Sequence, residues 1–360
     1  MKKLILCSLS FLLSTINAID PTIPLLHLPD FYNESTKEQF LTKLENAACE
    51  VGFFCLTGTG IDPDLLDHSY AEIMSYFNRD LGEKKSHKTQ DGQRGYVAGE
   101  SAKSELRMDF KEFFHVGREL SDETLTKLDL PKNVWPLDDF EFKSAMLSLF
   151  EAMDSCKDSI GEAFSEILHQ DRNFIHDMTQ EGDCLMRAIY YPKNPPKDSI
   201  WAGAHTDINF FTILPRSTAK GLQVLNKEGK WIDVIVPEDA FVINCGDMLE
   251  NLTNGHFKSS YHRVIDTGEG TERYSVVFFV HPRSEDRLDP LPYFVEKMGE
   301  RKYANINRIE LLAERLIDLQ LASPKLMKFF VESGAIERLK EVGRFSKKAE
   351  DALLKAGYLP

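Results

Sequence analysis

The stretch His205-Thr206-Asp207 lies at the start of the region that determines the fold. From Cys184 to Val280, short β-rich runs alternate with turn residues such as Asn226-Lys227-Glu228-Gly229. The runs are Cys184–Tyr191, Phe210–Leu214, Leu222–Leu225, Trp231–Val236, Phe241–Cys245, Ser260–Ile265 and Tyr274–Val280. Many short strands at even spacing predict a sandwich or jelly roll. We therefore expect a mainly β fold with flanking helices.

His205 and Asp207 have side chains that bind metal ions. In an extended segment, residues two apart point to the same face, so both can bind one ion. His262 lies in the later run Tyr261-His262-Arg263-Val264 and can supply a third ligand. Two imidazoles and one carboxylate leave coordination positions open, which is the facial triad of iron(II) oxygenases. The sequence predicts an Fe²⁺ site with these three ligands and assigns no catalytic residue beyond them.

A second pair of polar side chains follows in Arg273-Tyr274-Ser275. The same period of two places Arg273 and Ser275 on one face of a strand. A guanidinium group pairs bidentately with a carboxylate, and a nearby hydroxyl adds one hydrogen bond. Inside a barrel, this pair can hold the distal carboxylate of 2-oxoglutarate while its 2-oxo acid end chelates the iron.

The stretch from Cys184 to Pro282 resembles the core of the family of isopenicillin N synthase and the plant-type 2-oxoglutarate dioxygenases. Besides the triad and Arg273-Tyr274-Ser275, the motifs that carry the resemblance are Tyr190-Tyr191-Pro192, Gly221-Leu222-Gln223-Val224, Asn244-Cys245-Gly246-Asp247 and Asn254-Gly255. The N-terminal half resembles the same family through Gly52-Phe53-Phe54, Gly95-Tyr96 and Asp109-Phe110-Lys111-Glu112-Phe113-Phe114. Together these motifs span most of the chain.

The resemblance implies a double-stranded β-helix, or jelly-roll, core. The residues that it assigns to Fe²⁺ and 2-oxoglutarate are His205, Asp207, His262, Arg273 and Ser275. It also implies an enzyme that consumes O2 and 2-oxoglutarate and releases succinate and CO2. The expected reaction is the oxidation, by default the hydroxylation, of a small organic substrate.

Other contacts follow from position in the strands and from the resemblance. Tyr191 matches the position that hydrogen-bonds the chelating end of 2-oxoglutarate, although Ile189 stands where relatives often carry asparagine. Phe279 shares a face with the two carboxylate-binding residues, and Arg187 shares a face with Tyr191. Tyr96 lies in a loop that often covers the pocket in relatives. We expect Phe279, Arg187 and Tyr96 to contact the substrate.

Other functions are compatible with the same residues. Isopenicillin N synthase-like oxidases use iron and O2 without 2-oxoglutarate, and they retain the Arg-x-Ser motif. A non-enzymatic binding module on an inherited barrel would be expected to have a broken triad, and this triad is intact. A metal-dependent hydrolase is a further alternative, because zinc accepts the same ligands. The use of 2-oxoglutarate by most branches of the family favours a 2-oxoglutarate-dependent dioxygenase.

The composition of the chain limits the kinds of molecule that it is expected to bind. The chain has 360 residues, a formal net charge of −14 and no cluster of Lys or Arg. Nucleic-acid binding requires a basic patch that neutralises phosphates, so we expect a small-molecule substrate and no nucleic acid. The sequence leaves the oligomeric state open.

The N-terminus differs from the rest of the chain. Lys2 and Lys3 precede an apolar run from Leu4 to Leu13, and small residues follow up to Ala18. This pattern is typical of a secretory signal peptide, which predicts a secreted or periplasmic protein; without cleavage the protein is expected to be cytoplasmic. The run is too short to span a bilayer, so we expect no stable membrane anchor.

The rest of the chain divides by pattern. We expect a signal peptide at 1–18, a helical and strand region at 19–182, the jelly-roll core at 183–285 and a helical extension at 286–360. The clearest helix is predicted between Phe142 and Leu168, where apolar residues recur every three or four positions. The cysteines are expected to be small buried residues rather than ligands. His256, in the Asn254-Gly255 turn, is expected to face solvent.

Overall fold

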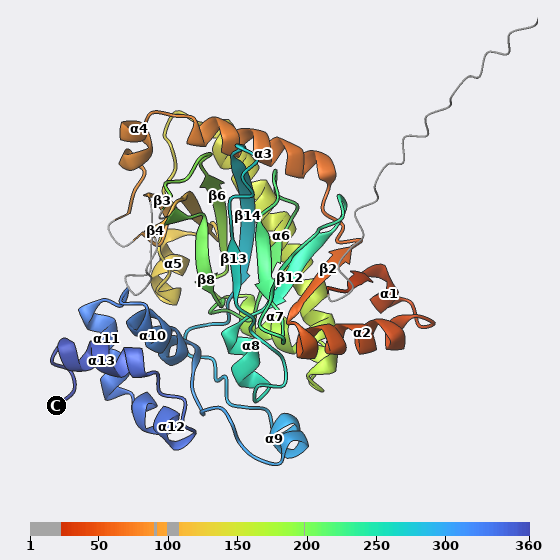
Figure 1. Ribbon diagram of the computed structural model, residues 1–360, viewed down its shortest axis with the longest axis vertical. Helices are drawn as coiled ribbons and strands as arrows, with labels where there is room; N and C mark the ends of the chain where they lie inside the picture. The colour runs from red at the N-terminus through yellow and green to blue at the C-terminus, as the bar shows by residue number, and fades with distance from the viewer. Residues whose placement is uncertain (1–22, 90–91, 99–107, 198) are drawn as a thin grey trace, which may run out of the picture.

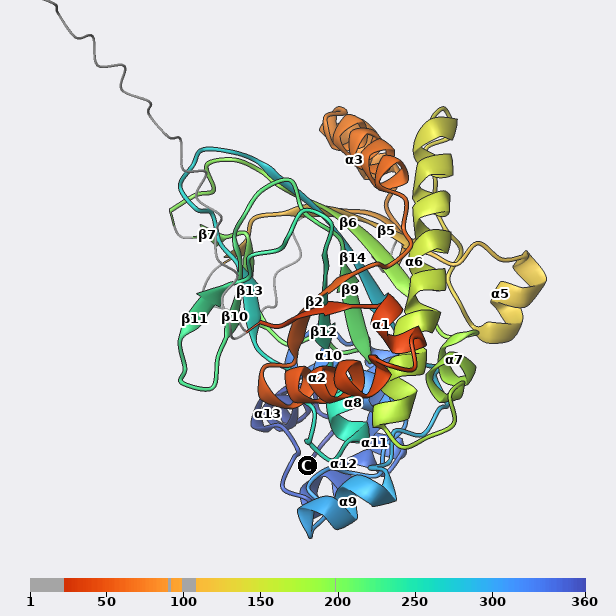
Figure 2. The same ribbon diagram turned by 90° about the vertical axis from the view of Figure 1, so that its right-hand side faces the viewer.

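The structure is a computed structural model that describes residues 23–89, 92–98, 108–197 and 199–360. The predicted signal peptide at 1–18 lies outside these ranges. Two facing β-sheets form the centre of the molecule, and helices pack against the larger sheet (Figures 1 and 2). The expected class, mainly β with flanking helices around a jelly-roll core, is confirmed.

The large sheet has eight strands, which are antiparallel to their neighbours except for the parallel pair β1 and β2. In sheet order they are β1 (Leu25–His27), β2 (Phe53–Thr57), β12 (Phe241–Cys245), β9 (Phe211–Leu214), β14 (Arg273–Val280), β6 (Leu185–Tyr191), β5 (Glu112–Gly117) and β3 (Gly95–Ala98). The antiparallel small sheet contains β11 (Trp231–Asp233), β10 (Leu222–Leu225), β13 (His262–Val264) and β8 (Ala202–His205). A separate parallel pair is formed by β4 (Met108–Asp109) and β7 (Ser199–Ile200).

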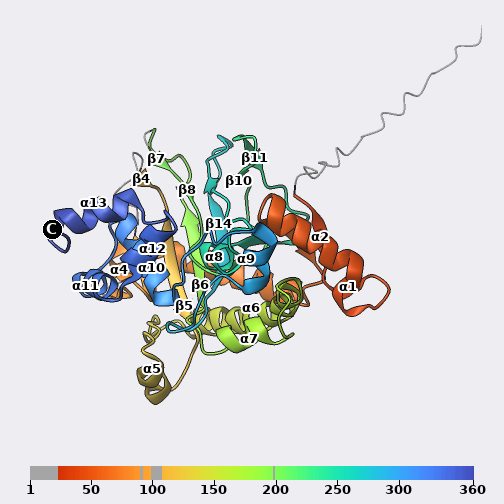
Figure 3. The same ribbon diagram turned by 90° about the horizontal axis from the view of Figure 1, so that it is seen from below.

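Helices surround the sheets at both ends of the chain. Before the small sheet they are α1 (Pro29–Tyr32), α2 (Lys37–Glu50), α3 (Pro63–Phe77), α4 (Leu81–Ser86), α5 (Asp122–Leu128), α6 (Phe140–Ile167) and α7 (Phe174–Thr179). After β12 comes α8 (Asp247–Leu252), and after both sheets come α9 (Pro292–Met298), α10 (Arg308–Asp318), α11 (Pro324–Glu332), α12 (Ala335–Glu341) and α13 (Lys347–Lys355). Helices α10 to α13 gather at one side of the molecule, away from α1 and α2 (Figure 3). No helix in the described ranges is both long and apolar enough to cross a membrane.

The longest helix, α6, is the one predicted from the apolar spacing. Asp139 caps its N-terminus by accepting a hydrogen bond from the Phe142 N–H at 2.9 Å. Its apolar stripe from Phe142 to Ile167 is buried. With α3, this helix covers the outer face of the large sheet, where it contacts β5 and β14 (Figure 2).

The alternation of side chains along the large sheet divides the core in two. Along β14, Tyr274, Val276 and Phe278 pack into the core under the helices. Val277, between them in sequence, belongs to a second core between the two sheets. We call the face of the large sheet that points toward the small sheet the inner face. The second core borders this face, which carries the predicted ligands of 2-oxoglutarate, while the predicted histidine ligands of iron lie on the small sheet opposite.

Candidate active site

The pairing of two strands brings the predicted histidine ligands together. His205 ends β8, His262 begins β13, and the two residues are direct partners in the antiparallel ladder. Their ring centroids are 4.4 Å apart. Asp207 follows two residues after β8, and its Oδ1 lies 3.8 Å from His205 Nε2 and 3.7 Å from His262 Nε2. One ligand atom from each of the three residues lies within 4.8 Å of the others, so the three can bind one ion. We call this group the triad.

Both imidazoles are oriented by backbone carbonyl groups. His205 Nδ1 lies 2.7 Å from the Gly203 oxygen, and His262 Nδ1 lies 3.2 Å from the Ser260 oxygen. Only a protonated Nδ1 can donate to a carbonyl, so a neutral ring presents its Nε2 lone pair to the centre of the triad. Strand β8, which carries His205, is anchored by Asp109, whose carboxylate accepts a hydrogen bond from the Gly203 N–H at 2.9 Å.

The second oxygen of Asp207 is held from the large sheet. Its Oδ2 accepts hydrogen bonds from Thr212 Oγ1 at 2.5 Å and from Asn244 Nδ2 at 2.8 Å. Thr212 and Asn244 are direct partners on β9 and β12, which explains how both reach one carboxylate. Sequence reasoning assigns neither residue a role, and Asn244 appears there only as part of a family motif.

The surroundings keep two ligands in the forms that bind a metal. Burial opposes ionisation of Asp207, but the neighbouring histidines and the hydrogen bonds from Thr212 and Asn244 outweigh it and lower the pKa of this carboxyl. Desolvation and the adjacent His262 lower the pKa of His205 to about 4. At neutral pH, Asp207 is thus ionised and His205 is neutral. The donor set fits Fe²⁺ with positions left open for other ligands.

Arg273 meets the requirements of an anion-binding residue. It pairs with Tyr191 across β14 and β6, and its guanidinium lies 4.9 Å above the tyrosine ring. Its Nε donates to the Ala219 oxygen at 3.1 Å, whereas its Nη1 is buried without a hydrogen-bond partner among the described residues. A buried unpaired N–H is costly, and a ligand carboxylate would satisfy it. Ser275 lies on the same face of β14 and is also buried.

Two of the three predicted substrate contacts lie on this inner face. The Arg187 guanidinium lies 5.3 Å from the Phe279 ring centroid and 4.2 Å from that of Phe113. Its Nε donates to His115 Nε2 at 2.7 Å, while His115 Nδ1 lies 3.0 Å from the Gly92 oxygen. Phe113 and His115 are buried and contact Arg187, a role that the sequence does not predict, because the pairing of β5 with β6 is not visible in it.

Tyr96 does not reach the same space, and its prediction as a substrate contact is corrected. The residue lies on β3, where its side chain is fully buried in the core under the helices. Its hydroxyl donates to Glu112 Oε2 at 2.9 Å. Val97, the next residue, packs against the core between the sheets instead. The alternation of β3 therefore turns Tyr96 away from the triad.

The C-terminal helix α10 contacts Thr206, the residue between the ligands His205 and Asp207. The Thr206 hydroxyl donates to Asp247 Oδ2 at 3.2 Å and accepts from Arg315 Nη2 at 3.3 Å. Arg315, on α10, also pairs with Asp247 through its Nε at 3.0 Å. Nothing local in the sequence marks Arg315, because it is 109 residues from Thr206.

A jelly roll with this triad defines the class of iron(II) oxygenases, and comparison with known proteins agrees. Residues 182–282 match the model of the 2OG-Fe(II) oxygenase superfamily, and residues 23–138 match the model described as non-haem dioxygenase in morphine synthesis N-terminal. The 2-oxoglutarate-dependent dioxygenase citB of Monascus ruber is 32% identical over 277 residues, 72% of this chain and 83% of that protein. Gibberellin 20 oxidase 3 of Arabidopsis thaliana is 30% identical over 289 residues, 78% of this chain and 76% of that protein. The chain belongs to the 2OG-Fe(II) oxygenase superfamily.

Solved structures agree with this assignment. A full-length protein of Neurospora crassa in complex with alpha-KG, which is 2-oxoglutarate, matches with a TM-score of 0.73 and 26% identity over 82% of this chain and 95% of that one. The chain is a 2-oxoglutarate-dependent dioxygenase that uses Fe²⁺ and O2. The alternative of an oxidase that works without 2-oxoglutarate is therefore not favoured.

Proposed function

We propose that His205, Asp207 and His262 hold Fe²⁺ and that Arg273, Ser275 and Tyr191 bind 2-oxoglutarate. The convergence of three ligand atoms within 4.8 Å carries the first part of this proposal. The buried, unpaired Nη1 of Arg273 supports the second.

When bound, iron and 2-oxoglutarate supply the oxidising chemistry, in which O2 and 2-oxoglutarate are converted to succinate and CO2 while the substrate is oxidised. The protein orients these partners. Thr212 and Asn244 keep Asp207 ionised and fix its direction. Buried Phe53, whose ring lies 5.4 Å from that of His262, helps to exclude water from the triad.

The substrate is a small organic molecule that is hydroxylated against the inner face. One structure of the Neurospora crassa protein contains thymine and another contains 5-formyluracil, and both compounds are small planar molecules. In this chain, the partly buried Phe279 offers an apolar ring surface, and Arg187 lies between it and the fully buried ring of Phe113. These side chains favour a substrate with an apolar body and an acidic group.

The test is succinate formation by the iron-loaded protein in the presence of 2-oxoglutarate and a panel of small acids and their neutral amides. We expect some acids to stimulate succinate release and to gain one oxygen atom by mass spectrometry. Arg187→Leu should raise KM for those acids and leave the slow substrate-free turnover unchanged. Equal stimulation by acids and amides would contradict the role of Arg187.

We also propose that residues 1–18 direct export and are removed, a proposal that rests on the sequence pattern alone. Expression of the full chain in a secreting host, followed by N-terminal sequencing of the exported protein, tests it. A mature N-terminus shortly after Ala18 is expected. Recovery of the uncut chain in the cytoplasm would contradict the proposal.

A further inference from the structure

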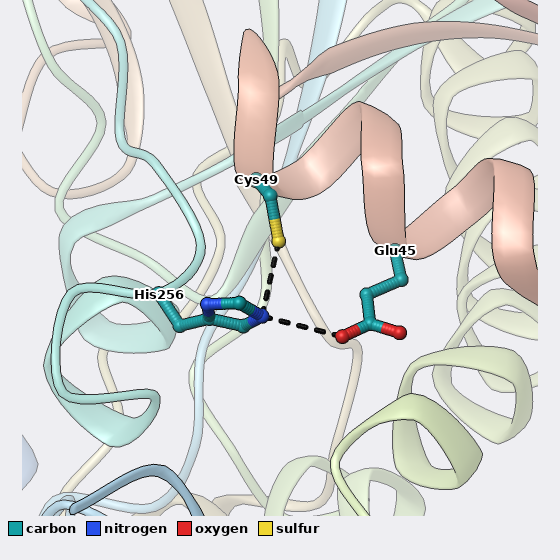
Figure 4. A group of neighbouring side chains, drawn as sticks. All are labelled: Glu45, Cys49 and His256. Carbon is teal, nitrogen blue, oxygen red and sulfur yellow. Dashed lines mark hydrogen bonds and ion pairs between the residues drawn. The ribbon is translucent and has the colours of Figure 1, made fainter. Parts of the chain in front are cut away.

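A second group of ligand-type side chains lies away from the triad, where α2 meets the turn after α8 (Figure 4). Glu45 and Cys49 are four residues apart on α2, so their side chains share one face of the helix. His256 points at both from the turn. That turn is fixed by Asn254, whose Oδ1 accepts hydrogen bonds from the Lys302 and Tyr303 N–H groups. We call Glu45, Cys49 and His256 the α2 cluster.

This arrangement corrects two expectations from the sequence. His256 does not face solvent, because its side chain is only 20% exposed. Cys49 is not simply an apolar residue of the core, because its Sγ lies 3.2 Å from His256 Nε2. Helices α2 and α9, from opposite ends of the chain, cover the turn on which His256 lies.

The distances within the α2 cluster suit one small cation. Glu45 Oε1 also lies 3.2 Å from His256 Nε2, and the ligand atoms of all three residues lie within 4.8 Å of one another. Tetrahedral zinc bound by nitrogen, oxygen and sulfur gives ligand-to-ligand separations of about 3.3–3.6 Å. Small side-chain adjustments would therefore suffice to bind zinc.

Without a metal, the His256 Nε2 atom has incompatible neighbours. Lys297 Nζ lies 3.1 Å from this nitrogen and 3.1 Å from Glu45 Oε1. An imidazole nitrogen either donates or accepts a hydrogen bond, so it cannot accept from the lysine and donate to the glutamate in one tautomer. A metal ion would serve the nitrogen, the sulfur and the oxygen at once.

We propose that Glu45, Cys49 and His256 bind a zinc ion outside the catalytic centre. Thiolate, imidazole and carboxylate are the ligands that zinc prefers, and two anionic ligands neutralise its charge. On binding, the thiol proton leaves to solvent and a Zn–S bond forms. The Lys297 side chain, 37% exposed, moves away into water. Water completes the coordination, and the ion connects α2 to the turn after α8.

Cobalt(II) is a suitable probe, because a Co²⁺–thiolate bond gives an intense near-ultraviolet charge-transfer band. The triad contains no sulfur, so Co²⁺ bound there cannot give this band. We expect the full-length protein to show the band with about one Co²⁺ bound per chain besides the Co²⁺ that fills the triad. His205→Ala should retain the band. Zn²⁺ should then displace the Co²⁺ and abolish the band.

Cys49→Ala should lose the band, and Glu45→Gln should weaken Co²⁺ binding while preserving the side-chain shape. Cys156→Ala, which removes a buried thiol from α6, is the matched control and should keep the band. Lys297→Met removes the competing ammonium and should tighten binding about tenfold. No band in the wild type, a band that survives Cys49→Ala, or unchanged binding in Lys297→Met would overturn the proposal.

Discussion

The triad and the α2 cluster contain similar chemical groups, but the fold prepares them differently. In the triad, strand register places His205 opposite His262, and backbone carbonyls orient both rings. In the α2 cluster, a helix face and a turn bring the side chains together, and Lys297 lies among them. The triad is therefore prearranged to bind a metal ion with coordination positions left open. At the α2 cluster, a metal ion must displace the Lys297 ammonium group.

The largest effect is expected from Asp207→Asn, which removes a ligand charge but keeps the side-chain shape. Loss of hydrogen-bonding partners around a metal site costs about 10- to 100-fold in affinity, so loss of a ligand should cost more than about 100-fold. Succinate formation should fall accordingly. Asp239→Asn, at an exposed position, is the control and should behave like the wild type. Full activity of Asp207→Asn would remove the distinction between the triad and an ordinary polar cluster.

The next effect concerns the anion-binding residues beside the triad. Arg273→Leu should raise the Kd for 2-oxoglutarate about 100-fold, because a bidentate charged pair is lost. Ser275→Ala should raise it about tenfold, because one hydrogen bond to a charged group is lost. Isothermal titration of the anaerobic iron-loaded protein measures both values. Equal Kd values for Arg273→Leu and the wild type would show that the carboxylate binds elsewhere.

Thr212→Val tests whether the support of Asp207 distinguishes the triad from the α2 cluster. The change keeps the side-chain shape and removes the hydrogen bond to Asp207 Oδ2. Iron affinity should fall about tenfold, the lower end for groups that hold a ligand in place. Thr42→Val removes a hydroxyl that bonds only within α2 and should leave iron affinity unchanged.

The two sites should also respond differently to pH. Burial, and then the nearby Glu45, raise the pKa of Cys49 to about 11, so metal binding at the α2 cluster displaces a thiol proton. Co²⁺ affinity there should rise about tenfold from pH 7 to pH 8. At the triad, the lowered pKa values of His205 and Asp207 mean that neither residue has a proton to lose in this range. Co²⁺ titrations followed by the thiolate band and by the weaker visible bands separate the two sites, and parallel slopes would contradict the comparison.

The smallest effect is expected from Arg315→Met. This change removes the contact of α10 with Thr206 and Asp247 but touches no ligand. Iron affinity should fall about threefold, since coupling through a neighbouring network is weak. The melting temperature should also fall, because Asp247 loses its charged partner. An effect as large as that of Thr212→Val would mean that the C-terminal helices are part of the support of the triad.

The sequence predicted well what depends on local pattern. The runs that became β6, β9, β10, β12 and β14 and the helix α6 follow from alternation or helical spacing. The period of two also places His205 and Asp207 on one face, whereas the position of His262 opposite His205 depends on the pairing of β13 with β8. Strand spacing left a sandwich and a jelly roll open, and the family motifs favoured the jelly roll and the use of 2-oxoglutarate as cosubstrate.

Features that depend on contacts between distant segments of the chain could not be predicted from the sequence. Tyr96 was misplaced because its face depends on the pairing of β3 with β5, which brings two segments of the N-terminal half into the large sheet. His256 was misplaced because turns usually lie at the surface, whereas α2 and α9 pack over this one. Thr212 and Arg315 have no sequence signal, since their partners are set by tertiary contacts.

The central claim is that the triad holds iron and that Arg273 holds 2-oxoglutarate beside it. The most direct test is an anaerobic titration of the Fe²⁺-loaded protein with 2-oxoglutarate, followed by the weak visible charge-transfer band of the chelate. We predict a band at one equivalent in the wild type, a right-shifted titration in Arg273→Leu and no band in His205→Ala. A wild-type protein that binds iron but gives no band, or a band that persists in His205→Ala, would contradict the account.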